Sequence, residues 1–481
     1  MPAYLVRVTG AALLVVLLTS CGGSGAHGTI PSQPLVQGTL QSMRSVSPSA
    51  ASQRFKYVIV IVQENRSFDN MFHGFPGANS ANTGMGHGKV YTLQPVHLKW
   101  PYVLNHSHSQ FLEDYDNGKM DGFNDMIEGW VHGCKDFRNH PACWRFYPQQ
   151  KYKQMAYSYV KESDIEPYWT MAKDYALGDN TFTSNSGPTF PAHQYYIAGQ
   201  SDHASEVPSL NPWGCDGPPS SIVVKLAYGY STPPHDFSKA TGHEVNGPHP
   251  CFDRDVYKKT IADLLDAKSV SWHYYVSKPI TSSLNGFDAV KAVRYGPDWA
   301  NMEVDTNFSD DVKNGNLAHV SWVTPEPLES DHPGPDSGSG GPDWVASVVN
   351  AVGESKYWNN CAIFIMWDDW GGWYDHVAPP QIPDVETGAY EGLGFRTPLI
   401  VISPYVKTHY ISHQQYELVS SMSFIEKVFD LGNLGMADAR AQPFDDFFND
   451  SHQPAPFQPI PSHLNAHYFM THQDSGIVDE E

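Results

Sequence analysis

Acidic and amide side chains follow two apolar, strand-like runs that lie far apart in the chain. Glu64 and Asn65 follow the first run. Asp368 and Asp369 follow the second. In open α/β sheets, active sites collect at the carboxyl ends of buried strands. Because carboxylate and amide oxygens suit a hard divalent cation, the two strand ends together predict a site for one metal ion.

Each pair of residues is ambiguous when it is taken alone. Acidic residues at a strand end commonly mark only the point where the strand meets solvent and a capped helix begins. Further motifs accompany the two pairs, and the whole set lies at 64–69, 117–123, 186–189, 271–275, 331–333, 368–380 and 395–405. In type and order these motifs resemble the bacterial phosphoesterase family of the non-hemolytic phospholipases C and related acid phosphatases, within the alkaline-phosphatase-like superfamily. The motif at 64–69 is its most specific signature.

This resemblance implies a metal centre and a nucleophile. It assigns Glu64, Asn65, Asp368 and Asp369 to one divalent ion, with the hydroxyl of Thr189 as a further ligand and as the attacking group. The identity of the ion stays open among Zn, Ca, Mg and Mn. Attack on phosphorus would form a phosphothreonine that water then hydrolyses.

Thr189 stands before a segment with helical character, so taken alone it would be interpreted as a helix N-cap. A hydroxyl at a helix N-terminus beside a cation is also stabilised as an alkoxide, which suits a nucleophile. The resemblance favours this second interpretation.

Three of the 23 histidines are catalytic candidates because of their positions. His106 and His332 match family positions that hydrogen-bond the phosphoryl oxygens or assist the leaving group, as a side chain titrating near neutral pH can do. His376 lies in the motif at 368–380, after the proposed ligands Asp368 and Asp369. Its alternative role is to orient the loop that this motif forms. His108 is a close neighbour of His106 in the sequence.

The expected activity is hydrolysis of a phosphate ester, either a phospholipid or a phosphomonoester. Residues 190–194, directly after Thr189, are closer to the phosphatase branch, so the preference for a diester or a monoester stays open. One alternative is a sulfatase-like ester hydrolase, although the arginine of the sulfatase motif is missing after Thr189. The other is a noncatalytic surface lipoprotein that binds glycans or lipid headgroups.

The N-terminal segment predicts export from a bacterial cell. Arg7 precedes a short apolar run at 11–18, and Cys21 ends a stretch that resembles a lipobox. We expect residues 1–21 to be a signal peptide with a lipid anchor on Cys21, and 22–52 to be a flexible linker. The protein would then be a cell-envelope lipoprotein, periplasmic or on the cell surface, or else secreted after an ordinary signal peptide.

The composition describes a globular, acidic protein. Hydrophobic residues make up 41% of the chain, and the formal net charge is −22. We expect no nucleic-acid partner, because binding a phosphate backbone needs a basic face. The sequence does not indicate an oligomeric state.

The cysteines suit an oxidising compartment. Cys134 and Cys143 lie close together in a polar segment, and Cys215 and Cys251 flank a segment rich in Pro and Gly. We expect these two pairs to form disulfides. Cys361, at the start of an apolar run, is expected to be a buried free thiol.

The elements that must position these residues alternate between strands and helices. Strand-like runs lie at 56–62, 270–276, 319–324, 362–367 and 398–403, and helical spacing lies at 257–267, 343–352 and 419–431. This alternation predicts a mostly parallel sheet covered on both faces. The expected fold is a three-layer α/β/α sandwich of the alkaline-phosphatase-like type.

Long irregular segments complete the expected organisation. Those at 74–118, 203–252 and 277–310 are interpreted as loop insertions that build a pocket above the sheet. The catalytic domain is expected over 53–450, followed by a C-terminal tail over 451–481.

Overall fold

The computed structural model describes residues 54–125, 154–227, 243–281, 283–334, 338–383, 392–449 and 453–471. The expected signal peptide, linker and Cys134–Cys143 disulfide therefore lie outside the described residues. Within the described ranges, no helix combines the length and the apolar character needed to cross a membrane.

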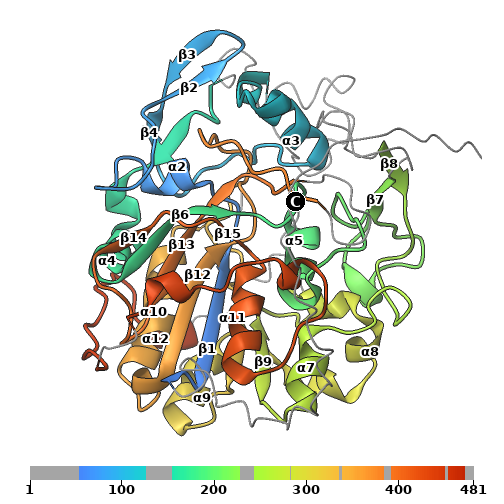
Figure 1. Cartoon of the computed structure of the whole chain (residues 1–481), viewed down its shortest axis with the longest axis vertical. Coiled ribbons are helices and arrows are strands. Elements are labelled where there is room, and N and C mark those ends of the chain that lie inside the picture. The colour runs from blue at the N-terminus through green and yellow to red at the C-terminus, as the bar shows by residue number, and fades with distance from the viewer. Residues whose placement is uncertain are drawn as a thin grey trace, which may run out of the picture. The chain divides into compact units, whose positions relative to one another are not determined.

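A nine-stranded sheet forms the centre of the fold (Figure 1). Its order is β10-β9-β11-β1-β12-β13-β6-β14, and β15 also pairs with β6. The strands are β1 (Tyr57–Gln63), β6 (Ala176–Phe182), β9 (Trp272–Val276), β10 (Met302–Val304), β11 (Val320–Val323), β12 (Cys361–Trp367), β13 (Arg396–Ile402), β14 (Tyr410–Ser412) and β15 (Tyr416–Glu417). Among the described strands of this sheet, only the pairings of β13, with β12 and with β6, are antiparallel. The predicted mostly parallel sheet is confirmed.

The central strands are apolar along almost their whole length because both of their faces are covered. β12 is buried at every position, and β1 at every position except Tyr57. Continuous Val and Ile runs of this kind are typical of parallel strands inside an α/β fold. All five strand-like runs of the sequence form strands of this sheet.

The helices that contact one another form two groups. One consists of α5 (Thr189–Ala198), α7 (Ile261–Ala267) and α11 (Ser420–Phe429), and the other of α4 (Glu166–Asp174), α9 (Asn307–Asn314), α10 (Gly341–Gly353) and α12 (Ala466–Thr471). The three helices predicted from spacing are α7, α10 and α11. The mixed α/β architecture with a large central sheet agrees with the predicted fold class.

Four strands of the central sheet, β6, β10, β14 and β15, lie outside the strand-like runs predicted from the sequence. β6 carries Gly178, Asp179 and Asn180, which are residue types depleted in strands, so its pattern is weak. The segment 277–310 is not only an insertion, because it contributes the edge strand β10 to the central sheet. A strand of three residues is too short to show a period.

The other irregular segments lie outside the central sheet. They form β2 (Thr83–Gly86) with β3 (Lys89–Thr92), β4 (Gln94–Val96) with β5 (Ser158–Val160), and β7 (Val224–Ala227) with β8 (His243–Asn246). Figure 1 shows the β2–β3 hairpin and α3 (His108–Tyr115) at the top, on the side where β1 leads into α2 (Phe68–Phe72). The β2–β3 hairpin and α3 are therefore on the side of the sheet where β1 ends.

The described part of the expected C-terminal tail packs against α10. Asn350 makes two hydrogen bonds with the backbone of Ile460, at 2.9 and 2.7 Å. The indole of Trp358 donates to the carbonyl of Ala455 at 2.7 Å. Residues 453–471 thus belong to the same compact unit as the sheet.

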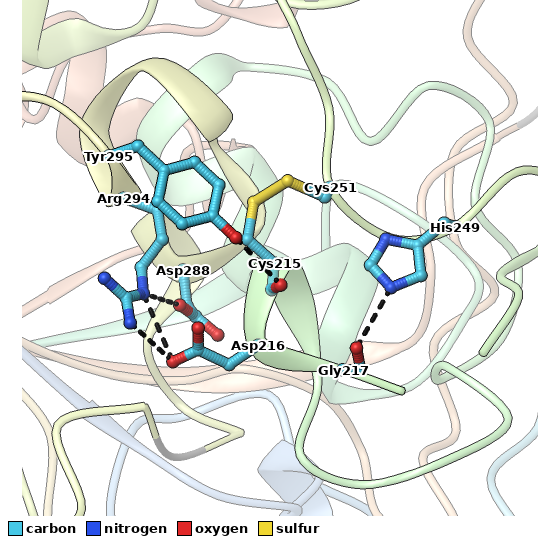
Figure 2. The surroundings of a disulfide bond; sticks show 8 residues. All are labelled: Cys215, Asp216, Gly217, His249, Cys251, Asp288, Arg294 and Tyr295. Carbon is cyan, nitrogen blue, oxygen red and sulfur yellow. Dashed lines mark hydrogen bonds and ion pairs between the residues drawn. A yellow bond between two sulfur atoms is a disulfide. The ribbon is translucent and has the colours of Figure 1, made fainter. Parts of the chain in front are cut away.

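One predicted disulfide and the free thiol are confirmed. Cys215 and Cys251 are bonded (Figure 2), and Cys361 is a buried free cysteine. Arg294 lies beside this disulfide and forms ion pairs with Asp216 at 2.9 Å and Asp288 at 3.1 Å.

Candidate active site

The carboxyl ends of β1 and β12 lie side by side. The two strands are parallel, with Gln63 opposite Trp367. Beyond that pair the backbones stay connected, because the Asp368 amide donates to the Gln63 carbonyl at 3.0 Å and the Arg66 amide to the Asp369 carbonyl at 3.0 Å. The two predicted ligand pairs are therefore adjacent in the fold.

The turn after β1 needs an unusual backbone conformation. Asn65 has φ of 60°, in the left-handed region that asparagine tolerates better than most residues. Its backbone amide donates to Oδ1 of Asp368 at 3.1 Å. A Cβ at Gly371 would lie only 2.1 Å from the carbonyl oxygen of Asn65, so glycine is needed there. The shape of this corner thus depends on both residues together.

Thr189 joins this corner from a different part of the chain. It is the first residue of α5, whose N-cap is Pro188. Its hydroxyl donates to Oδ2 of Asp368 at 2.6 Å and lies 3.5 Å from Oδ2 of Asp369. The structure thus brings the predicted nucleophile into direct contact with a predicted metal ligand.

The donor set at this corner fits a hard divalent cation. The side chains of Glu64, Asp368 and Asp369 are at most 1% exposed. Ionised carboxylates buried together are costly unless a positive charge compensates them. The carboxylate, amide and hydroxyl oxygens of these residues, Asn65 and Thr189 are the donor types that such an ion prefers.

His106 also lies at this corner, as expected. Its Nδ1 lies 2.7 Å from the carbonyl of Leu104, and its Nε2 lies 3.2 Å from Nδ2 of Asn65. A carbonyl can only accept, so Nδ1 carries the proton and Nε2 is left to accept from the amide of Asn65. The ring of His332 lies 6.2 Å from that of His106. His108 instead contacts the hydroxyl of Ser186 at 2.9 Å.

His193 is a polar residue of this site that the sequence analysis missed. It is 1% exposed and lies one helical turn after Thr189 on α5, and its Nε2 lies 3.9 Å from Oδ2 of Asp368. Its Nδ1 lies 3.1 Å from the hydroxyl of Tyr274, which itself donates to the Leu284 carbonyl at 2.7 Å. Because that hydroxyl proton is already used, Nδ1 of His193 is the donor. The i, i+4 spacing from Thr189 is the signal that could have found it.

His376 lies in a different group of charged residues. It contacts Asp69, with Nδ1 2.6 Å from Oδ2, and Asn79, with Nε2 3.1 Å from Oδ1. Burial lowers its pKa, but the hydrogen bond and charge of Asp69 outweigh this effect and the pKa is raised overall. These contacts fit the alternative role for His376, which is to hold the loop that follows the second metal motif.

Asp69, Asp375 and His376 could by geometry hold a metal ion, since their ligand atoms lie within 4.8 Å of one another. The guanidinium of Arg396, however, lies 3.3 Å from Asp69 and 3.1 Å from Asp375. A fixed positive charge at this position already compensates the two carboxylates. We therefore interpret this group as a buried ion-pair network rather than a metal centre.

The start of α5 packs against the two chain segments that the disulfide joins. The ring of Phe190, the residue after Thr189, lies 6.0 Å from Trp213 and 6.3 Å from Phe252. Trp213 is two residues before Cys215, and Phe252 follows Cys251, so the disulfide shown in Figure 2 joins the two segments that hold Phe190.

Comparison with known proteins identifies the family. The sequence matches the Phosphoesterase family over residues 55–432. Phospholipase C A of Mycobacterium tuberculosis (strain CDC 1551 / Oshkosh) is 24% identical over 413 residues, which cover 78% of this chain and 72% of that protein. The non-hemolytic phospholipase C of Burkholderia pseudomallei (strain K96243) is 26% identical over 417 residues, covering 78% of this chain and 55% of that protein.

A solved structure of a protein in the alkaline phosphatase superfamily from Vibrio parahaemolyticus aligns with 80% of this chain and 70% of its own. Its sequence identity is 8% and its TM-score is 0.33, which is too loose to inform the site. The family match favours the hydrolase over the noncatalytic lipoprotein and the sulfatase-like enzyme considered above. This chain belongs to the Phosphoesterase family and is a phosphoric ester hydrolase.

Proposed function

We propose that the enzyme is metal-dependent and that Thr189 attacks the phosphorus of the ester. The observation that carries this proposal is the 2.6 Å contact between the Thr189 hydroxyl and Asp368, inside a group of buried oxygen donors. Glu64, Asn65, Asp368 and Asp369 would hold one divalent ion together with Thr189. When bound, that ion would neutralise the carboxylates and draw electron density from the phosphoryl oxygens.

In the first half-reaction, Thr189 Oγ forms a bond to phosphorus while the bond to the leaving alcohol breaks. The hydroxyl proton of Thr189 already points at Asp368 Oδ2, so this carboxylate is its first acceptor. The leaving oxygen takes up a proton from the protonated imidazole of His106 or His332 and departs as the alcohol. In the second half-reaction, water attacks the phosphothreonine and gives a proton to the same histidine, while Thr189 regains its proton from Asp368. Phosphate or a phosphomonoester is released.

In this proposal His106 and His332 serve the phosphoryl group and the leaving oxygen. Both are largely buried, with 5% and 7% of their surface exposed. His106 is oriented by Leu104 and by the amide of Asn65, which fixes its ring beside a proposed ligand. A general acid or base placed in this way contributes typically about 10²–10⁴-fold to the rate.

The proposed substrate is a phosphate ester, and the two substrate classes can be separated by experiment. We would measure the release of the phenol from an aryl phosphate monoester and of phosphocholine from phosphatidylcholine, for the wild type and for Thr189→Ala. The proposal expects the wild type to hydrolyse at least one of them and the variant to hydrolyse neither. A variant with wild-type turnover would contradict the assignment of the nucleophile.

We also propose export with a lipid on Cys21, on the strength of the residues around it. Labelling cells that express the full chain with an alkyne-bearing fatty acid would test this. Incorporation that disappears in Cys21→Ala is the expected result. Equal labelling of both proteins, or none of the wild type, would contradict the lipid anchor.

A further inference from the structure

Asp331 is connected to both strand ends of the site and precedes His332. It is 1% exposed. Its backbone amide donates to Oε1 of Gln63 at 2.9 Å, and its carbonyl accepts from Nε of Arg66 at 2.8 Å. Gln63 and Arg66 flank Glu64 and Asn65 in the sequence. The backbone of Asp331 is therefore hydrogen-bonded to the residue before and the residue after the first pair of proposed ligands.

The carboxylate of Asp331 is hydrogen-bonded to the residue before the second pair of proposed ligands, Asp368 and Asp369. Its Oδ2 accepts from the indole of Trp367 at 2.9 Å and from the hydroxyl of Tyr168 at 2.9 Å. Trp367 directly precedes Asp368. One buried residue therefore contacts neighbours of both proposed metal-binding pairs, from a loop that also carries a proposed catalytic histidine.

The first turn of α10 closes the remaining side of this carboxylate. A Cβ at Gly341, the first residue of the helix, would lie 2.2 Å from Oδ1 of Asp331. Only glycine allows so close an approach, and the N-terminus of a helix of 13 residues favours a negative charge beside it. Oδ1 therefore lies directly against the first turn of α10, which leaves it no room to move toward that helix.

We propose that Asp331 is a positioning residue, which sets the place of His332 relative to Asn65 and Asp368. This inference rests on the proposed function, because it takes His332 to act on the substrate. The physical reason is that a displacement of about 1 Å in a catalytic group can cost on the order of 10²-fold in rate. Loss of the carboxylate would also leave the donors of Trp367 and Tyr168 unsatisfied in a buried place, so the loop would shift.

The test is a double-mutant cycle in the full-length protein. We would measure kcat and KM on the better of the two substrates for Asp331→Ala, His332→Ala and the double variant. The expected result is a fall in kcat of about 10–100-fold for Asp331→Ala with KM changed less than about threefold. In the His332→Ala background the same substitution should cost less than about twofold, because residues that act as a unit are not additive.

Two further variants separate positioning from a loss of fold. Tyr168→Phe removes a single hydrogen bond to Oδ2 of Asp331. We expect kcat to fall severalfold and the melting temperature to stay within a few degrees of the wild-type value. Asp343→Asn is the matched control, since this buried carboxylate in the first turn of α10 accepts from the backbone amides of His463 and Leu464, at 3.1 and 3.0 Å. It should lower the melting temperature and leave kcat unchanged.

Additive losses of Asp331→Ala and His332→Ala would overturn the inference, as would wild-type kcat in Asp331→Ala or in His332→Ala. The proposed function fails separately, if Thr189→Ala keeps its activity. The two failures are therefore distinguishable, because the cycle compares residues 331 and 332 and does not involve Thr189.

Discussion

The hydroxyl of Thr189 lies 2.6 Å from Oδ2 of Asp368, although the two residues are far apart in the chain. One begins helix α5 and the other follows strand β12. The contact brings the hydroxyl proposed as the nucleophile to the carboxyl ends of two parallel strands, where the surrounding groups are oxygen donors. The predictions below depend on this arrangement.

Removing a proposed ligand should affect metal binding before it affects the fold. We expect Asp368→Asn and Glu64→Gln to lose most of the bound divalent metal, measured by elemental analysis of the purified protein, and to lose activity with it. Excess Zn, Ca, Mg or Mn should restore part of the activity, because an amide oxygen is a weaker ligand than a carboxylate. Asp375→Asn serves as the comparison, because Asp375 pairs with Arg396 and its loss should leave the metal content unchanged. Full metal content in Asp368→Asn would place the ion elsewhere.

The histidines should differ in their effects on the rate. His106→Ala should lower kcat by roughly 10²–10⁴-fold, the usual scale for a general acid or base. His376→Ala should act mainly on stability, because its imidazole is bonded to Asp69 beside Arg396. Steady-state kinetics and thermal melts of both variants make the comparison. A larger loss of kcat in His376→Ala than in His106→Ala would reverse the two assignments.

The disulfide should support the start of α5. Its cysteines are 36 residues apart in sequence, and closing a loop of that size is worth about 4 kcal/mol in the chain-entropy account. We expect Cys215→Ser/Cys251→Ser to melt at a lower temperature. Its kcat should fall as well, because the aromatic contacts that hold Phe190 beside Thr189 would loosen.

A reducing agent should reproduce both effects in the wild type and have no further effect on the double serine variant. Further slowing of that variant by the reductant would show that a different disulfide is responsible. Unchanged kcat in the double variant would contradict the support of α5.

Glu206 should make stability fall as the pH rises from about 4.5 to about 8. Its carboxyl accepts from the backbone amide of His108 at 3.0 Å, and burial together with the charge of Glu244 raises its pKa from 4.5 to about 8. The unfolded chain therefore loses this proton at lower pH than the folded protein does. The contribution of Glu206 to stability is complete below about pH 4.5 and is lost as the pH rises through about 8.

Thermal melts between pH 5 and pH 9 test this titration. Glu206→Gln keeps an acceptor for His108 and cannot ionise, so its melting temperature should fall less over that interval than that of the wild type. Parallel curves for the two proteins would show that Glu206 does not titrate as proposed.

The sequence predicted the structure best where polar side chains directly follow an apolar, strand-like run. The runs before Glu64 and Asp368 are continuous and apolar, so the strands and their polar ends could be predicted together. β6 could not, because Gly178 and Asp179 interrupt its pattern, and it is a strand through its pairing with β13, β14 and β15. Tertiary pairing there overrides local preference.

The environment of the site was harder to predict than its central residues. His193 could have been found from its spacing to Thr189 on α5. The partners of Asp331 come from three separate segments, and which of them would meet depends on the folded sheet. The position of His376 beside Asp69, rather than beside Thr189 and Asp368, likewise depends on the fold.

The most direct test of the account is to look for phosphate bound covalently to Thr189. An acid quench during turnover of an aryl phosphate, followed by digestion and mass spectrometry, should find the peptide that contains Thr189 carrying one phosphoryl group. Thr189→Ser should give phosphoserine at the same position, and Thr189→Ala should give no adduct. A phosphoryl group on another residue, or turnover by Thr189→Ala at the wild-type rate, would contradict the central claim.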